Sequence, residues 1–93
     1  MKKIETWEDL KEAFKDNKDI SFKIITTSED YASSKIISYG ESIVLNQDVA
    51  FNQKGQLLIW YFDRYEDEEC WREEGVKNRT YQQIYNIIKL MLE

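Results

Sequence analysis

One apolar run, Leu-Leu-Ile-Trp-Tyr-Phe at residues 57–62, most constrains what this chain can fold into. Its length and its aromatic and β-branched content are typical of a buried strand, and it is far shorter than the roughly 20 residues that cross a bilayer. Because successive side chains of a strand point to opposite faces, both faces of this strand would be apolar. Either helices cover both faces, or one face is left open for a partner. We expect the covered arrangement.

Two threonines mark the expected beginnings of helices. Thr6 is followed by Asp9, and Thr80 is followed by Gln83, at the spacing of a capping box, in which the two side chains satisfy free backbone N–H groups. Apolar residues then recur at intervals of three and four along each segment, which is typical of an amphipathic helix. The expected helices cover residues 7–16 and 81–92.

Strand-like runs fill the region between these helices, separated by short polar or glycine-containing breaks. Gly40-Glu41 is expected to form a tight turn, and residues 52–55 are expected to form a hairpin turn. Because the connections are only a few residues long, neighbouring strands should pair antiparallel. The expected strands cover residues 20–27, 35–39, 42–45, 49–51 and 56–62.

This order of elements predicts an α+β fold. It consists of an N-terminal helix, an antiparallel sheet of four to five strands, an acidic connection that could form a short helix, and a C-terminal amphipathic helix packed on the sheet. Ninety-three residues without a linker-like segment fit a single domain, residues 1–93. Cys70 is the single cysteine and no signal-peptide core precedes the first helix, so we expect a cytoplasmic protein.

The sequence lacks the side chains on which most enzyme chemistry depends. It contains no histidine, which removes the commonest general base and most zinc sites, and one cysteine cannot build a thiolate cluster. A glycine-rich phosphate loop is also missing. Residues 63–74 have the length of a calcium-binding loop, but Glu68 stands where such a loop requires glycine. We therefore expect a protein that is not an enzyme and that has no metal ion or cofactor.

Acidic residues are concentrated in residues 63–74, which hold seven carboxylates and two cations, whereas the rest of the chain is neutral. The resulting formal charge of −5 disfavours direct contact with nucleic acid or with an anionic membrane. On a short helix, Glu66, Glu69 and Glu73 would form an acidic ridge. The competing interpretation is an ordinary solvated helix whose Trp71 packs on the core.

The acidic ridge favours a small protein-binding module. Its expected partner is a basic protein, in particular a nucleic-acid-binding protein whose phosphate-binding channel the carboxylates would occupy. In size, charge and element order the chain resembles phage and mobile-element anti-defence proteins, including anti-CRISPR proteins. That resemblance implies an inhibitor of a nucleic-acid-binding protein. The candidate protein-binding residues are Asp63, Tyr65, Glu66, Asp67, Glu69, Trp71, Glu73 and Glu74.

Two other functions stay open. A small-ligand binding or sequestering domain would use the open face of the sheet, with Trp60, Tyr39 and Tyr31 lining its site, although core packing is the commoner use of such aromatic residues. A homodimer would pair through an exposed edge strand or an apolar sheet face. A ligand-dependent rise in melting temperature would indicate the first function, and a concentration-dependent size in solution would indicate the second.

Overall fold

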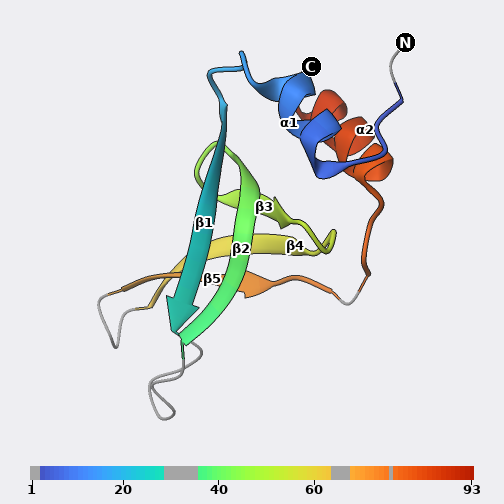
Figure 1. Cartoon of the computed structure of the whole chain (residues 1–93). Coiled ribbons are helices and arrows are strands. Elements are labelled where there is room, and N and C mark those ends of the chain that lie inside the picture. Colours follow the sequence, from blue (N-terminus) through green and yellow to red (C-terminus); the bar gives the residue numbers. More distant parts are fainter. Residues whose placement is uncertain (1–2, 29–35, 64–67, 76) are drawn as a thin grey trace.

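Helices at both ends of the chain flank a run of antiparallel strands (Figure 1). The computed structural model of the protein describes residues 3–28, 36–63, 68–75 and 77–93. The five strands form one sheet in the order β1-β2-β3-β4-β5, and every neighbouring pair is antiparallel. The predicted α+β fold is therefore confirmed. The elements are α1 (Trp7–Phe14), β1 (Ile20–Ser28), β2 (Ile36–Leu45), β3 (Val49–Asn52), β4 (Leu57–Asp63), β5 (Glu68–Glu73) and α2 (Tyr81–Met91).

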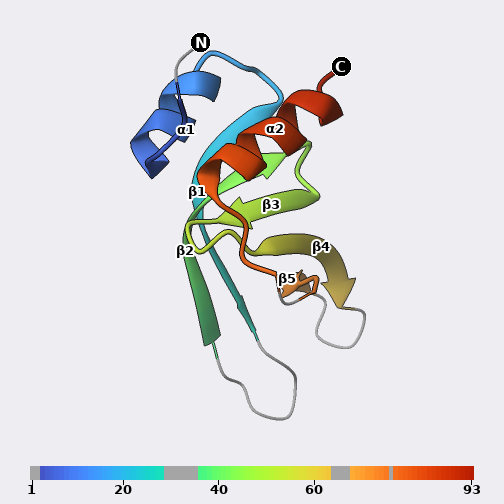
Figure 2. The same cartoon turned by 90° about the vertical axis from the view of Figure 1, so that its right-hand side faces the viewer.

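Both helices pack against the same face of the sheet, which we call the outer face (Figures 1 and 2). The sheet curls, so that its first and last strands, β1 and β5, come into contact. The opposite side of the sheet, the inner face, lies inside this curl. The right-handed twist of strands and a shift in the β1–β2 register both favour such curling.

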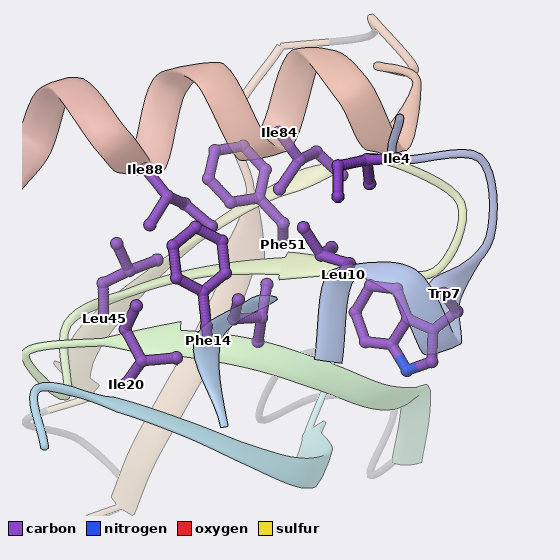
Figure 3. Close-up of a cluster of buried hydrophobic side chains, with 10 residues drawn as sticks. Ile4, Trp7, Leu10, Phe14, Ile20, Leu45, Phe51, Ile84 and Ile88 are labelled. Carbon is purple, nitrogen blue, oxygen red and sulfur yellow. The ribbon is translucent and has the colours of Figure 1, made fainter. Parts of the chain in front are cut away.

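The outer face and the two helices share one hydrophobic core, the outer cluster (Figure 3). Ile84 and Ile88 project from α2 toward the sheet. The Trp7 ring of α1 meets Phe22 of β1 edge-on, with ring centroids 6.0 Å apart. These contacts fix both helices on the sheet, because each helix buries its apolar stripe there. The buried members are Ile4, Trp7, Leu10, Phe14, Ile20, Ile43, Leu45, Phe51, Ile84 and Ile88.

Both predicted capping boxes are present. The Thr6 hydroxyl accepts from the backbone N–H of Asp9, and the Asp9 carboxylate accepts from the backbone N–H of Thr6, each at 3.1 Å. Thr80 and Gln83 exchange the equivalent bonds at 3.1 Å and 2.8 Å. Helix α1 ends two residues earlier than expected and α2 one residue earlier. Among the described residues, no helix combines the length and the apolarity needed to cross a membrane.

Glu41 of β2 ties the sheet to α1. Its carboxylate accepts a 2.7 Å hydrogen bond from the Trp7 indole N–H and lies 3.0 Å from the Lys11 ammonium. The Trp7 hydrogen bond, together with Lys11, holds the pKa of the Glu41 carboxyl below its usual range. This contact therefore contributes its full stability above the unfolded-state pKa, and the contribution is lost as the pH falls through the lower, folded-state pKa.

The inner face carries a second core, the inner cluster, built entirely from strand residues. Leu57 of β4 packs with the outer cluster, whereas Leu58 packs inside the curl. The expectation that the helices cover both faces of this strand is therefore wrong. Both helices lie on one face, and the curl lets residues of β1 and β5 meet and bury the other. The buried members are Ile25, Val44, Ala50, Leu58 and Trp71, with Tyr39 and Trp60 packed against them.

Strand β2 runs without interruption past Gly40-Glu41, so the predicted tight turn there is wrong. Gly40 has a φ of 72°, a left-handed conformation that glycine reaches without strain. The β1–β2 register shifts beside it, between Ile25 and Thr26. Such an irregularity bends a strand instead of ending it. The glycine that suggested a turn thus belongs to the curl of the sheet.

Strand β5 occupies most of residues 66–74, and the prediction of a short helix there is wrong. Pairing of β5 with β4 places Trp71 opposite Trp60 and Cys70 opposite Tyr61. Trp71 is buried in the inner cluster, as expected for its ring, and Cys70 is buried from the other side of the strand. This long-range burial outweighs the local preference of a glutamate-rich segment for helix.

Candidate functional site

The predicted acidic ridge depends on a helix that β5 replaces. A strand rises by about 3.3 Å per residue, so positions 69 and 73 are separated by roughly 13 Å, about twice their helical spacing. Asp63 and Glu69 hold paired positions in β4 and β5, opposite Glu68 and Phe62. The predicted acidic ridge therefore does not form on this surface. The remaining candidates Tyr65, Glu66 and Asp67 lie outside the residues that the structure describes.

Glu73 and Glu74 are exposed at the end of β5. The backbone N–H of Glu74 donates to the Leu57 carbonyl at 2.9 Å, which fixes this end of the strand beside β4. Arg72 Nε lies 3.8 Å from a carboxylate oxygen of Glu74. Glu73 is two residues beyond Trp71 and shares its strand face. Glu73 thus borders the inner face, whereas Glu74 follows the end of the strand beside Arg72.

A cleft of about 400 Å³, the inner cleft, opens on the inner face where β1, β4, β5 and the β2–β3 turn meet. Small-molecule sites usually have volumes of about 300–1,000 Å³. Two tryptophans supply apolar surface, and the other lining residues supply hydrogen-bonding groups and charges of both signs. The lining residues are Ser21, Lys23, Asn46, Gln47, Asp48, Trp60 and Trp71.

The two tryptophans of the inner cleft lie directly opposite each other on β4 and β5. Trp71 is only 8% exposed and packs against Leu58 and Val44 in the inner cluster, which holds its ring in place. Trp60 packs against the same cluster but is only half-buried. Part of its ring is therefore available to a ligand, on a wall that the core makes rigid.

The turn between β2 and β3 holds two cleft residues in an unusual backbone conformation. Asn46 has a φ of 50° and Gln47 a φ of 69°, in the left-handed region that costs a residue with a side chain about 1–2 kcal/mol. The turn is fixed on both sides. The backbone N–H of Asn46 donates to the Asp19 carbonyl at 3.2 Å, and the Asp48 carbonyl accepts from the Trp60 N–H at 3.0 Å. Positive φ at both central residues is the type I′ geometry of a two-residue hairpin turn, in which Gln47 stands where glycine is usually found.

A second hollow of about 380 Å³ adjoins the inner cleft. Ser21, Asn46 and Gln47 line both, so the two hollows share the strained turn as a common wall. Lys18 and Asp19, which precede β1, extend the polar lining. The combined surface can stack a flat group on tryptophan and hydrogen-bond polar groups around it.

The sequence named Trp60 as a candidate ligand residue, and the structure places it in the inner cleft. Tyr39 packs against the inner cluster instead, and Tyr31 lies outside the described residues. The sequence reasoning missed Asn46 and Gln47, whose positive φ values leave no mark on a polar break between strands. It also missed Lys23, which alternates with Phe22 along β1 and therefore faces away from the helices.

The chain has no match among protein-family models, curated proteins or solved structures. Among the described residues, no group of three or more cysteine, aspartate or glutamate side chains comes together in the way that a metal ion needs. The inner cleft is therefore described by its own chemistry: two indole rings, two amides, a hydroxyl, an ammonium and a carboxylate.

Proposed function

We propose that this protein is a binding domain whose inner cleft holds a small polar ligand with one flat apolar face, such as a sugar ring or a heteroaromatic base. The observation that carries the proposal is a half-buried Trp60 facing the same cleft as the strained Asn46-Gln47 turn. An indole face packs well against a flat apolar group. The side-chain amides of Asn46 and Gln47 can then form hydrogen bonds with the polar edge of the ligand.

Two properties of the cleft support binding without turnover. Its wall is built before the ligand arrives, since Trp71 is packed in the inner cluster and the turn is hydrogen-bonded on both sides, so little ordering accompanies binding. Lys23 and Asp48 offer one charge of each sign, which suits a ligand with little net charge. The proposed role is therefore capture or sequestration of a small molecule.

The proposal is tested with two cleft variants and a panel of sugars and nucleosides, read by melting temperature and tryptophan fluorescence. A ligand of the cleft is expected to raise the melting temperature of the unmodified protein. Trp60→Leu is expected to weaken binding at least about tenfold, because the stacking surface is lost. Gln47→Gly is expected to bind several times more weakly, because an amide of the cleft is lost. Its free energy of unfolding should nevertheless rise by about 1 kcal/mol, because glycine adopts the left-handed conformation without strain.

Tyr61→Leu is the matched control, because Tyr61 is an aromatic residue of the same strand that is opposite Cys70 on the other face. It should keep the affinity of the unmodified protein. A panel in which no compound changes either signal, or a Trp60→Leu variant that binds as tightly as the control, would count against the cleft as a ligand site.

The acidic end of β5 supports a second candidate function, recognition of a basic protein and inhibition of a nucleic-acid-binding one. Glu73 and Glu74 are exposed, and within the described part of the chain no ion pair joins Glu73 to a cation. Their carboxylates could meet lysine and arginine side chains that otherwise bind phosphates. The proposed setting of both functions is the cytoplasm, since the single cysteine leaves no intrachain disulfide to form.

Charge reversal tests this second candidate. A Glu73→Lys/Glu74→Lys variant is expected to lose a basic protein that the unmodified chain captures from a host lysate at low salt. A Glu8→Lys/Asp16→Lys variant makes the same change in net charge near α1 and is expected to keep that partner. Equal capture by both variants, or capture that high salt does not weaken, would rule out recognition through the end of β5.

A further inference from the structure

A pocket of about 260 Å³ lies on the helix side of the molecule, between α2 and the segment that leads into it. It is separate from the inner cleft and shares no residue with it. Its lining holds two cations, two amides and one apolar side chain, and no carboxylate. The lining residues are Lys77, Arg79, Gln83, Asn86 and Ile87. We call it the donor pocket.

Both amides of the donor pocket have their oxygen atoms already engaged. Oε1 of Gln83 accepts the backbone N–H of Thr80 at 2.8 Å within the capping box. Oδ1 of Asn86 accepts the side-chain N–H of Gln82 at 3.1 Å. Each amide therefore has its NH₂ group left for another acceptor. With the two cations, every polar side chain that lines this pocket offers donors.

Arg79 is held in place, but one of its guanidinium nitrogen atoms lacks a hydrogen-bond acceptor among the described residues. Its backbone N–H donates to the Gly55 carbonyl at 3.0 Å, and its guanidinium lies over the Phe51 ring, 5.7 Å from the centroid. Its Nη1 atom is buried, and no described residue accepts a hydrogen bond from it. A buried donor without an acceptor is unfavourable, and more so when it carries charge. The ion pairs of the described residues include neither Arg79 nor Lys77.

We propose that the donor pocket binds a small phosphate monoester through its phosphoryl oxygens. A guanidinium, an ammonium and two NH₂ groups around one hollow match the several acceptor oxygens of a phosphoryl group. Ile87 offers an apolar surface to the organic part of the ligand. The proposal rests on side-chain donors and not on the helix end, where the capping box already engages the backbone N–H groups of Thr80 and Gln83. A bound phosphate would explain why a chain of net charge −5 holds two cations that pair with no carboxylate among the described residues.

The test is a titration of the protein with inorganic phosphate, phenyl phosphate and benzoate, each against sodium chloride at equal ionic strength, followed by ¹H–¹⁵N NMR. We expect saturable shifts of the side-chain NH₂ signals of Gln83 and Asn86 and of the Arg79 Nε–H signal. Phenyl phosphate should bind more tightly than inorganic phosphate, because it also contacts Ile87. Benzoate, which has a carboxylate in place of the phosphoryl group, should bind at least several times more weakly.

Substitutions of two exposed lysines distinguish binding in the donor pocket from general attraction of an anion to positive charge. Lys77→Gln is expected to weaken phenyl phosphate binding about tenfold, whereas Lys89→Gln, which removes the same charge from α2 outside the pocket, should leave it unchanged. Asn86→Asp should abolish binding by placing a carboxylate among the donors. Equal affinities of the two lysine variants, shifts no larger than those with chloride, or benzoate binding as tightly as phenyl phosphate would overturn the proposal.

Discussion

Replacing Gly55 with alanine is expected to lower the free energy of unfolding by about 3–5 kcal/mol, most of the stability of a domain this small. Gly55 has a φ of 83° in the turn before β4. An added methyl group would overlap the carbonyl oxygen of Arg79 and lie 2.6 Å from its backbone nitrogen. Because these atoms are backbone, no side-chain rotation can relieve the overlap. The segment that leads into α2 must then leave the turn, and the Arg79–Gly55 hydrogen bond breaks.

Gly75→Ala is the matched control for this experiment, with both variants unfolded in urea and followed by far-UV circular dichroism. Gly75 has a similar φ of 78°, but an added methyl group there would meet no atom within 4 Å. Its variant should lose only the conformational cost of about 1–2 kcal/mol. The difference between the two losses measures the close approach of Arg79 to Gly55. Equal losses would show that this approach does not hold α2 on the sheet.

The helices were predictable because their signals are local. A capping box depends on two residues that are three positions apart, and both boxes, at Thr6 and Thr80, form as the sequence indicates. The apolar stripe behind each box also lies within one short segment. Each helix therefore begins where expected, and only the last turn differs, because helix ends depend on what the chain does next.

The curl of the sheet was not predictable, because it depends on contacts between distant residues. Nothing near Glu68–Glu73 indicates that Trp71 will pair with Trp60, and the local glutamates favour helix. Gly40 is equally ambiguous, since glycine serves both tight turns and bent strands. Only the long-range burial of the inner cluster decides both cases. The second apolar face of β4 is buried in the same inner cluster.

The candidate site was predictable in its aromatic part and not in its polar part. Trp60 stands out in the sequence as an aromatic residue of the apolar run, and it was a candidate for the ligand site. Asn46 and Gln47 read as an ordinary break between strands, since the sequence does not reveal a positive φ at either position. Arg79 lies more than twenty residues from Phe51, the ring of β3 that its guanidinium approaches. Among the residues that the structure describes, neither Lys77 nor Arg79 forms an ion pair with a carboxylate, and this becomes visible only when the chain is folded.

Leu58→Ala is expected to lower the free energy of unfolding by about 3 kcal/mol, within the usual range for a leucine in a close-packed core. Leu58 is fully buried on the inner face, between its strand partners Ala50 and Glu73, and packs against Trp71. A sheet whose inner face is solvated would lose about 1 kcal/mol or less from the same change. The measured loss therefore decides whether the inner cluster is a core, independently of any ligand.

Leu90→Ala provides the comparison, because Leu90 is 70% exposed on α2 and should change stability by no more than about 0.5 kcal/mol. Similar losses for the two variants in urea unfolding would contradict a packed inner face. The Leu58 variant should also shift the tryptophan fluorescence of the folded protein, since the void opens in the inner cluster to which Trp71 belongs. Trp71 is one wall of the inner cleft, so a looser ring weakens ligand binding at the same time. Core packing and the proposed binding function thus depend on the same side chain.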